Sequence, residues 1–125
     1  MAVDVLVVDD DETLQQLVKH QLGAAGYEVR VCEDGRAAAD VLDGGYEPDI
    51  AVMDVMMPRL DGMRLARMIR GGELAVRADL PIVMLTSRGR EEHVLEGFDA
   101  DVDDYVTKPF RSEELLARIR RHIDA

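Results

Sequence analysis

Acidic side chains stand directly after two apolar runs of the sequence. Asp9 and Asp10 follow the run Val5–Val8. Asp54 follows the run Ile50–Met53. Unbroken runs rich in Val and Ile are typical of buried parallel strands, whose carboxyl ends form the ligand-binding edge of an open α/β sheet. We therefore expect the three carboxylates to lie close together, where mutual repulsion raises carboxyl pKa values unless a cation binds between them.

The type of ligand atom indicates which cation this is. Clustered carboxylate oxygens without Cys or His suit Mg²⁺, with Mn²⁺ as a substitute. A simpler alternative is that Asp9, Asp10 and Asp11 only cap the helix expected after them. That alternative leaves Asp54 unexplained, so the sequence favours a metal site.

A hydroxyl and an ammonium group are expected at the same edge of the sheet. Thr86 follows the apolar run Ile82–Leu85, and Lys108 lies just past the run Tyr105–Val106. Lys108 is one of only two lysines in the chain. Its point charge can offset a phosphoryl oxygen as well as a carboxylate. Acids, a hydroxyl and an ammonium group together indicate a site that handles phosphate.

The elements that would position these residues alternate as strand and helix. Glycines and prolines separate them, and no linker or low-complexity tract divides the chain. The sequence therefore predicts one α/β domain, residues 1–125, with a doubly wound (βα)₅ parallel sheet. The expected strands are Val5–Val8, Tyr27–Val31, Ile50–Met53, Ile82–Leu85 and Tyr105–Val106. Apolar stripes predict helices at Leu14–Leu22, Ala38–Leu42, Gly62–Ile69, Val94–Phe98 and Leu115–Ile123.

Charge and composition exclude several classes of function. The net charge of −11, from 26 acidic and 15 basic residues, repels nucleic acid. No apolar run approaches the roughly 20 residues of a membrane span, and no secretory signal begins the chain. The single cysteine, Cys32, is expected to be a small buried hydrophobe. We predict a cytoplasmic chain that by itself binds neither nucleic acid nor membrane.

Four motifs in order are similar to those of one family. Each is weak alone, but all four follow the expected strand ends. Over essentially its whole length the chain resembles the receiver domains of two-component response regulators, including the chemotaxis regulators. The motifs are Val7–Asp11, Asp54–Gly62, Leu85–Ser87 and Asp103–Phe110.

The resemblance implies a fold and a metal site. The fold is flavodoxin-like, with five parallel strands in the order 2-1-3-4-5. Asp54 would be the phosphoacceptor. Asp10 and Asp54 would ligate Mg²⁺ directly, Asp9 would act through water, and the backbone carbonyl of Met56 would supply a further oxygen.

The resemblance also assigns roles around the phosphoryl group. Lys108 would contact it and Thr86 would donate its hydroxyl to it. Tyr105 would change rotamer as the domain switches. A cis Lys108–Pro109 peptide bond would aim the lysine into the pocket, and Met56 and Arg88 would tune the lifetime of the acyl phosphate.

The implied function is a phosphorelay switch. A histidine kinase or a phosphotransfer protein would phosphorylate Asp54. The face made by the fourth helix, fifth strand and fifth helix would then signal to a downstream protein or effector domain, and some relatives dimerise through the fourth and fifth helices. The domain would not be an enzyme acting on a separate substrate, although it would assist its own phosphorylation and autodephosphorylation.

Two other functions fit the sequence less well. An aspartate-based phosphatase usually carries a second acid two residues after its nucleophile, where this sequence has Met56. A degenerate receiver would serve only as a docking surface, but all the key side chains are present.

For the remaining acids and histidines the sequence suggests exposed positions and no functional role. The run Asp99, Asp101, Asp103 and Asp104 lacks the glycine and terminal glutamate of an EF-hand, so a solvated loop is expected. The three histidines are scattered over helical segments and are expected at the surface. They are His20, His93 and His122.

Overall fold

A five-stranded parallel sheet forms the centre of the computed structural model, which describes residues 2–57, 59–87 and 101–123. Each neighbouring pair of strands is parallel, in the order β2-β1-β3-β4-β5. The predicted fold class and strand order are therefore confirmed. The strands are β1 (Asp4–Val8), β2 (Glu28–Cys32), β3 (Ile50–Asp54), β4 (Ile82–Ser87) and β5 (Asp104–Lys108).

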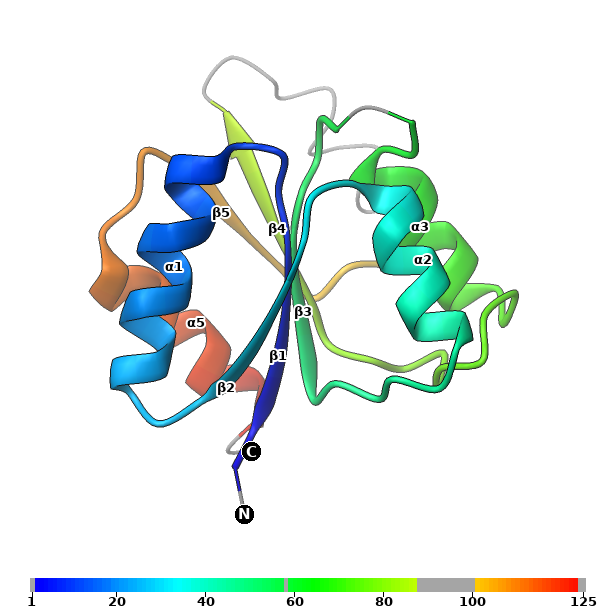
Figure 1. Ribbon diagram of the computed structural model, residues 1–125, viewed down its shortest axis with the longest axis horizontal. Helices are drawn as coiled ribbons and strands as arrows, with labels where there is room; N and C mark the ends of the chain where they lie inside the picture. The colour runs from blue at the N-terminus through cyan, green and yellow to red at the C-terminus, as the bar shows by residue number, and fades with distance from the viewer. Residues whose placement is uncertain (1, 58, 88–100, 124–125) are drawn as a thin grey trace.

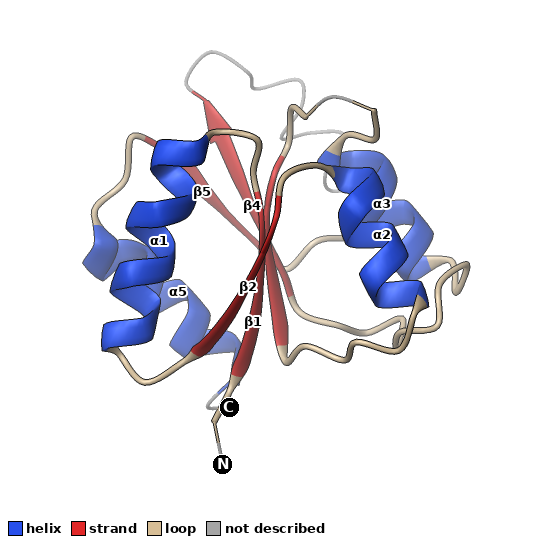
Figure 2. Ribbon diagram, in the orientation of Figure 1, coloured by secondary structure: helices blue, strands red, loops and turns tan. Residues whose placement is uncertain are grey.

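Helices cover both faces of this sheet (Figure 1). In Figure 2, α1 and α5 lie on one side and α2 and α3 on the other, which makes three layers. The bounds are α1 (Glu12–Ala24), α2 (Gly35–Asp43), α3 (Gly62–Arg70) and α5 (Ser112–Ile123). The helix expected at Val94–Phe98 lies outside the described residues, as do Arg88, His93 and Asp99. In the described part of the chain, no helix has the length and apolar character that crossing a membrane requires.

The apolar core has two halves, one on each face of the sheet. Successive strand residues point to opposite faces. Val5 and Val7 accordingly pack under α1 and α5, whereas Leu6 and Val8 pack under α2 and α3. Cys32 is buried, as predicted, and burial raises the pKa of its thiol. This two-sided burial explains why β1 reads as an unbroken apolar run.

The edge strand β2 departs from that pattern. Glu28 and Arg30 are exposed, because only one neighbour pairs with β2 and its side chains meet solvent. Tyr27, which was expected to begin this strand, precedes it. Its N–H instead donates to the Leu22 carbonyl at the end of α1.

Aspartates begin three helices at the carboxyl edge of the sheet. Asp11 accepts from the N–H groups of Thr13 and Leu14, so it caps α1. Asp34 and Asp61 cap α2 and α3 in the same way. Of the acids Asp9 to Asp11, the cap interpretation therefore holds only for Asp11.

The solvated loop predicted for the run of acids near β5 is wrong for Asp104, which is the partly buried first residue of β5, whereas Asp101 and Asp103 are exposed in the loop before it, as expected. Asp103 pairs with Arg70 of α3 at 2.9 Å and accepts the Ile82 N–H at 2.7 Å. Asp104 pairs with Arg118 at 2.8 Å and His122 at 3.1 Å. The two carboxylates thus tie β5 to helices on opposite faces of the sheet.

The same contacts correct the prediction for His122. Its side chain is only 20% exposed and hydrogen-bonds to Asp104, because α5 turns back along β5. His20 is exposed, as expected.

Replacing Asp104 should change how the free energy of unfolding depends on pH below neutrality. Burial alone would raise the pKa of Asp104, but hydrogen bonds from His122, the Tyr105 N–H and Arg118 outweigh it and lower the pKa. A carboxylate with a lowered pKa stabilises the fold above its unfolded pKa of about 4, and this stabilisation is lost as the pH falls through the folded value. Asp104→Asn should therefore be less stable than the parent at pH 7, with the gap closing towards pH 3.

Denaturant titrations between pH 7 and pH 3 would measure this gap. Asp40→Asn, at an exposed position of α2, is the matched control and should follow the parent curve. A constant gap at all pH values would contradict the assignment.

Candidate functional site

The carboxyl ends of four strands bring the predicted residues to one place. Asp9 directly follows β1, and Asp54 is the last residue of β3. Thr86 is the penultimate residue of β4, and Lys108 is the last residue of β5. The parallel register, with Val8 beside Met53 and Ser87 beside Lys108, aligns these ends.

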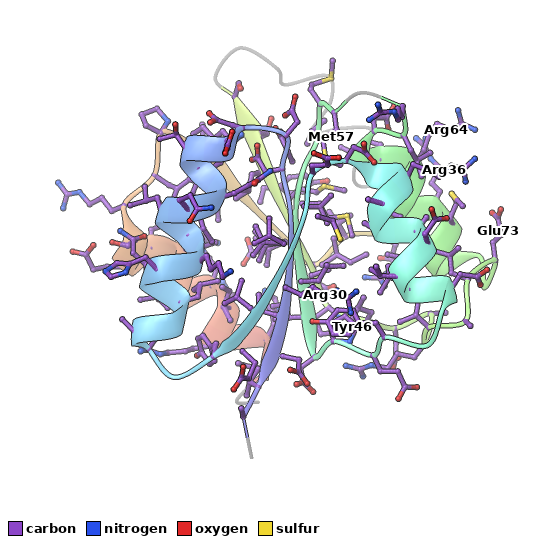
Figure 3. All side chains as sticks on the ribbon, in the orientation of Figure 1. Arg30, Arg36, Tyr46, Met57, Arg64 and Glu73 are labelled. Atoms are coloured by element: carbon purple, nitrogen blue, oxygen red, sulfur yellow. The ribbon has the colours of Figure 1, made fainter. Side chains whose placement is uncertain are left out.

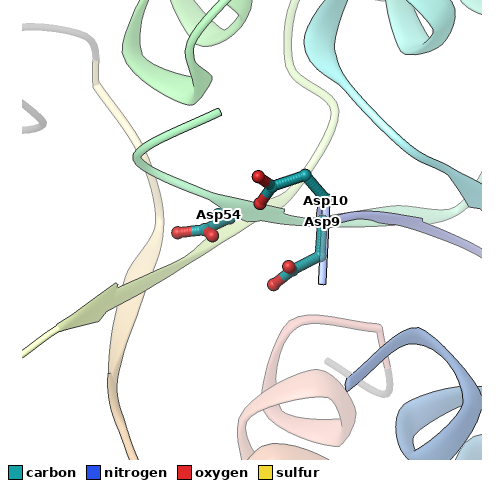
Figure 4. A group of neighbouring side chains, drawn as sticks. All are labelled: Asp9, Asp10 and Asp54. Carbon is teal, nitrogen blue, oxygen red and sulfur yellow. The ribbon is translucent and has the colours of Figure 1, made fainter. Parts of the chain in front are cut away.

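Three carboxylates form the acidic part of the site. Oxygens of Asp9, Asp10 and Asp54 all lie within 4.8 Å of one another. Figure 4 shows the three groups pointing to the same side of the β1 and β3 ends. Asp9 is fully buried, whereas Asp10 is exposed, so solvent reaches the cluster from the Asp10 side.

Lys108 bridges the two buried carboxylates. Its Nζ donates to Asp9 Oδ2 at 3.0 Å and to Asp54 Oδ2 at 3.1 Å. Burial alone would lower the pKa of Lys108, but hydrogen bonds and charges from both aspartates raise it. The lysine is therefore held in its charged form.

Backbone and side-chain donors hold Asp9 in place. The Asp11 N–H donates to Asp9 Oδ1 at 2.8 Å, and the Gln15 side-chain amide donates to the Asp9 carbonyl. With Lys108 on Oδ2, both carboxylate oxygens have partners. Asp9 is thus a fixed, satisfied charge despite complete burial.

The environment of Asp54 disfavours the charged form of its carboxyl. Burial raises the pKa of its carboxyl and the charge of Asp9 raises it further, while Lys108 opposes both. Among the described residues, its Oδ1 accepts one hydrogen bond, a long one of 3.3 Å from the Met56 N–H. Asp54 is buried, with 13% of its side chain exposed, so one edge of the carboxylate remains accessible.

The donor set fits a hard divalent cation. Among the described residues, one ammonium, that of Lys108, contacts two of the three carboxylates, so the acids outnumber the cations in this cluster. All the candidate ligands are oxygens, and the exposed side leaves room for the waters that Mg²⁺ retains.

The remaining predicted residues lie on β4, on β5 and in the loop after β3. Thr86 is buried, and among the described residues its hydroxyl makes one long contact, 3.5 Å to the Ser87 carbonyl. Tyr105 is half-buried against the core beneath α2 and α3, and burial raises the pKa of its hydroxyl to about 12. The Met56 side chain is exposed, and the Lys108–Pro109 peptide bond is cis.

Gly62, whose close contact with Asp54 the sequence did not reveal, begins α3. A Cβ on Gly62 would lie 2.2 Å from the backbone oxygen of Asp54. The loop from Asp54 to α3 is closed by the Gly62 N–H, which donates to the Val55 carbonyl at 3.0 Å. The glycine therefore sets how closely α3 approaches the end of β3.

A family model described as the response regulator receiver domain matches residues 5–120. The chain belongs to this family of receiver domains. The response regulator MprA of Mycolicibacterium vanbaalenii is 45% identical over 120 residues, which is 96% of this chain and 50% of that protein. MprA of Mycobacterium tuberculosis H37Rv shows the same identity and coverage. The chain thus spans about half the length of these curated relatives.

Solved structures agree with this assignment. A putative response regulator from Chloroflexus aurantiacus has a TM-score of 0.91 and 34% identity, with both chains fully covered. The receiver domain of a Pseudomonas aeruginosa sensor histidine kinase has a TM-score of 0.89 and 29% identity, again with full coverage of both chains. That structure holds a magnesium ion coordinated in its active-site cleft.

Proposed function

We propose that residues 1–125 work as one phosphorylatable receiver domain, with Asp54 as the phosphoacceptor. The observation that carries this proposal is the position of Asp54, a partly accessible carboxylate beside Lys108 and two further aspartates. The phosphoryl donor is a histidine kinase or a phosphotransfer protein. The domain assists this transfer and the later hydrolysis without acting on a separate substrate.

The transfer step exchanges one bond for another. An oxygen of Asp54 attacks the phosphorus of a phosphohistidine, a P–O bond forms, and the P–N bond breaks as the imidazole leaves. Such reactions depend on in-line positioning and on neutralising the phosphoryl oxygens. The Nζ of Lys108 lies 3.1 Å from Asp54 Oδ2, so its hydrogen bond can pass from the carboxylate to an oxygen of the phosphoryl group.

Asp10 and Asp54 would hold Mg²⁺ directly, with the Met56 carbonyl as a further ligand and Asp9 acting through water. The cation supplies positive charge that offsets the phosphoryl oxygens, and Mn²⁺ would serve in its place. Asp9 also orients Lys108, because its Oδ2 accepts from the ammonium at 3.0 Å.

Thr86 would convert phosphorylation into a conformational change. In the described part of the chain its hydroxyl makes one long contact, so turning it toward a phosphoryl oxygen would break no strong hydrogen bond there. A charge-assisted hydrogen bond of this kind contributes about 1.5–3 kcal/mol, enough to shift a two-state equilibrium roughly 10- to 150-fold. Tyr105, half-buried on the next strand, would change rotamer in response.

The output surface would be β5, α5 and the helix expected at Val94–Phe98, which lies outside the described residues. Its partner would be a downstream protein or effector domain in the cytoplasm, and a dimer through this face is an alternative use. Arg88, also outside the described residues, and Met56 would set the lifetime of the acyl phosphate.

Intact mass after incubation with acetyl phosphate tests the acceptor and the metal together. We expect the parent chain to gain one phosphoryl group in the presence of Mg²⁺ and little without it. Asp54→Asn should show no gain, because the amide cannot form the acyl phosphate. Asp61→Asn is the matched control, since asparagine also caps helices and Asp61 lies outside the cluster.

If the mass of the parent chain does not change, two explanations remain. The acyl phosphate is short-lived, or the domain is a receiver that serves only as a docking surface. Beryllofluoride, a stable phosphoryl mimic, distinguishes the two, because only a working acceptor site binds it. Failure to bind beryllofluoride with Mg²⁺ present would overturn the proposal.

A further inference from the structure

An arginine-lined groove lies on the α2 and α3 side of the molecule. Its volume is about 540 Å³, within the usual range for small-ligand sites. None of the residues that line it belongs to the Asp54 site. They are Arg36, Arg59, Leu60, Arg64, Arg67, Met68 and Glu73.

The charge of this groove is opposite to that of the chain. Four guanidinium groups face one carboxylate, although the chain as a whole carries −11. Arg36 of α2 and Arg64 of α3 extend outward close together in Figure 3. Solvent screens much of the repulsion between these exposed groups, and a bound anion would convert the remainder into attraction.

Most of these arginines have no internal partner. Arg59 pairs with the buried cap residue Asp34. Within residues 2–57, 59–87 and 101–123, the guanidinium groups of Arg36, Arg64 and Arg67 form no ion pair and no hydrogen bond. Their donors are available to a ligand.

The arrangement of the arginines indicates the ligand chemistry. A guanidinium presents a planar fork that binds phosphate oxygens through two parallel hydrogen bonds. Arg64 and Arg67 are three residues apart on one helix, so they lie on the same side of α3. Arg36 and Arg64 stand in the first turns of their nine-residue helices, where the helix dipoles add positive potential.

We propose that this groove binds a small anion carrying two or more phosphate groups, at a site separate from Asp54. The arginines span two helices and successive turns of α3, which suits an elongated ligand better than a single phosphate. Leu60 and Met68 provide an apolar surface for the rest of the ligand.

Calorimetric titration with inorganic tripolyphosphate tests the proposal on the whole chain. The buffer should contain no Mg²⁺, because tripolyphosphate chelates it. We expect one equivalent to bind, and Arg36→Gln and Arg64→Gln each to weaken binding about tenfold, the loss of one charge-assisted contact. Arg120→Gln and Arg121→Gln, at exposed positions on α5, are matched controls and should leave the affinity unchanged.

Amide chemical shifts locate the ligand. Changes confined to α2, α3 and residues 59–61 would support the groove, and Asp54→Asn should bind tripolyphosphate as well as the parent does. Equal weakening by the α5 controls, or shifts centred on Lys108, would overturn the proposal. Tighter binding of a glutamate-rich peptide than of tripolyphosphate would overturn the small-anion assignment.

Discussion

Lys108→Ala is expected to abolish the phosphoryl gain on Asp54 and to destabilise the metal-free domain by about 2–3 kcal/mol. The ammonium is the only cation that contacts Asp9 and Asp54 among the described residues. Removing one partner of a buried ion pair leaves uncompensated charge, which costs about 3–5 kcal/mol, and the 23% exposure of the Lys108 side chain reduces this figure. Adding Mg²⁺ should restore part of the lost stability, because a cation in the cluster replaces the missing charge.

Denaturant unfolding and intact mass would measure the two effects. Lys19→Ala, which removes the other lysine from an exposed position, should match the parent in both. Lys108→Arg keeps the charge but not the compact ammonium, so it should recover stability more than phosphorylation. Normal phosphorylation of Lys108→Ala would rule out the role assigned to this residue.

Gly62→Ala should strongly destabilise the domain. Its Cβ would lie 2.2 Å from the Asp54 carbonyl oxygen, a backbone atom that cannot rotate away. Overpacking of this kind costs about 1–3 kcal/mol, and we expect the upper end of that range. The displaced acceptor strand should also slow phosphorylation by acetyl phosphate.

Gly23→Ala is the matched control for that substitution. Gly23 lies within α1, and a Cβ there meets no atom within 4 Å. Alanine is a better helix former, so this variant should gain about 0.5–1 kcal/mol in unfolding free energy. If both variants had the same stability, the close approach of α3 to Asp54 would be refuted.

The sequence predicted the central strands well because they are covered on both faces. Val5–Val8 and Ile50–Met53 are fully buried, so their apolar runs leave no ambiguity about the element. Edge strands carry a weaker signal. The polar ends of β5, Asp104 and Lys108, fell outside the expected run because their side chains make ion pairs rather than apolar contacts.

The acidic cluster was also predictable, and for a topological reason. Parallel strands bring their carboxyl ends to one edge, so acids that follow two such strands must lie near each other. The burial of Asp9 and the bridging position of Lys108 were harder to predict from the sequence. They depend on β5 docking beside β4 and on a side chain that reaches across to β1 and β3.

Contacts between segments far apart in the sequence account for what was missed. Arg59 and Asp34 are 25 residues apart, and neither stands in a motif that marks the other. The ion pair between Asp104 and His122 requires knowing that α5 packs back against β5. A strand followed at once by an amphipathic helix was the available signal for that packing.

The position of Lys108 links signalling competence to the order of synthesis. Asp9 leaves the ribosome 99 residues before its ammonium partner, and Asp54 precedes that partner by 54 residues. A nascent chain that has exposed its acidic residues therefore still lacks the charge that balances them. If Asp54 is the phosphoacceptor, as proposed above, the site is complete only when β5, the last described strand, joins the sheet and brings Lys108 beside it.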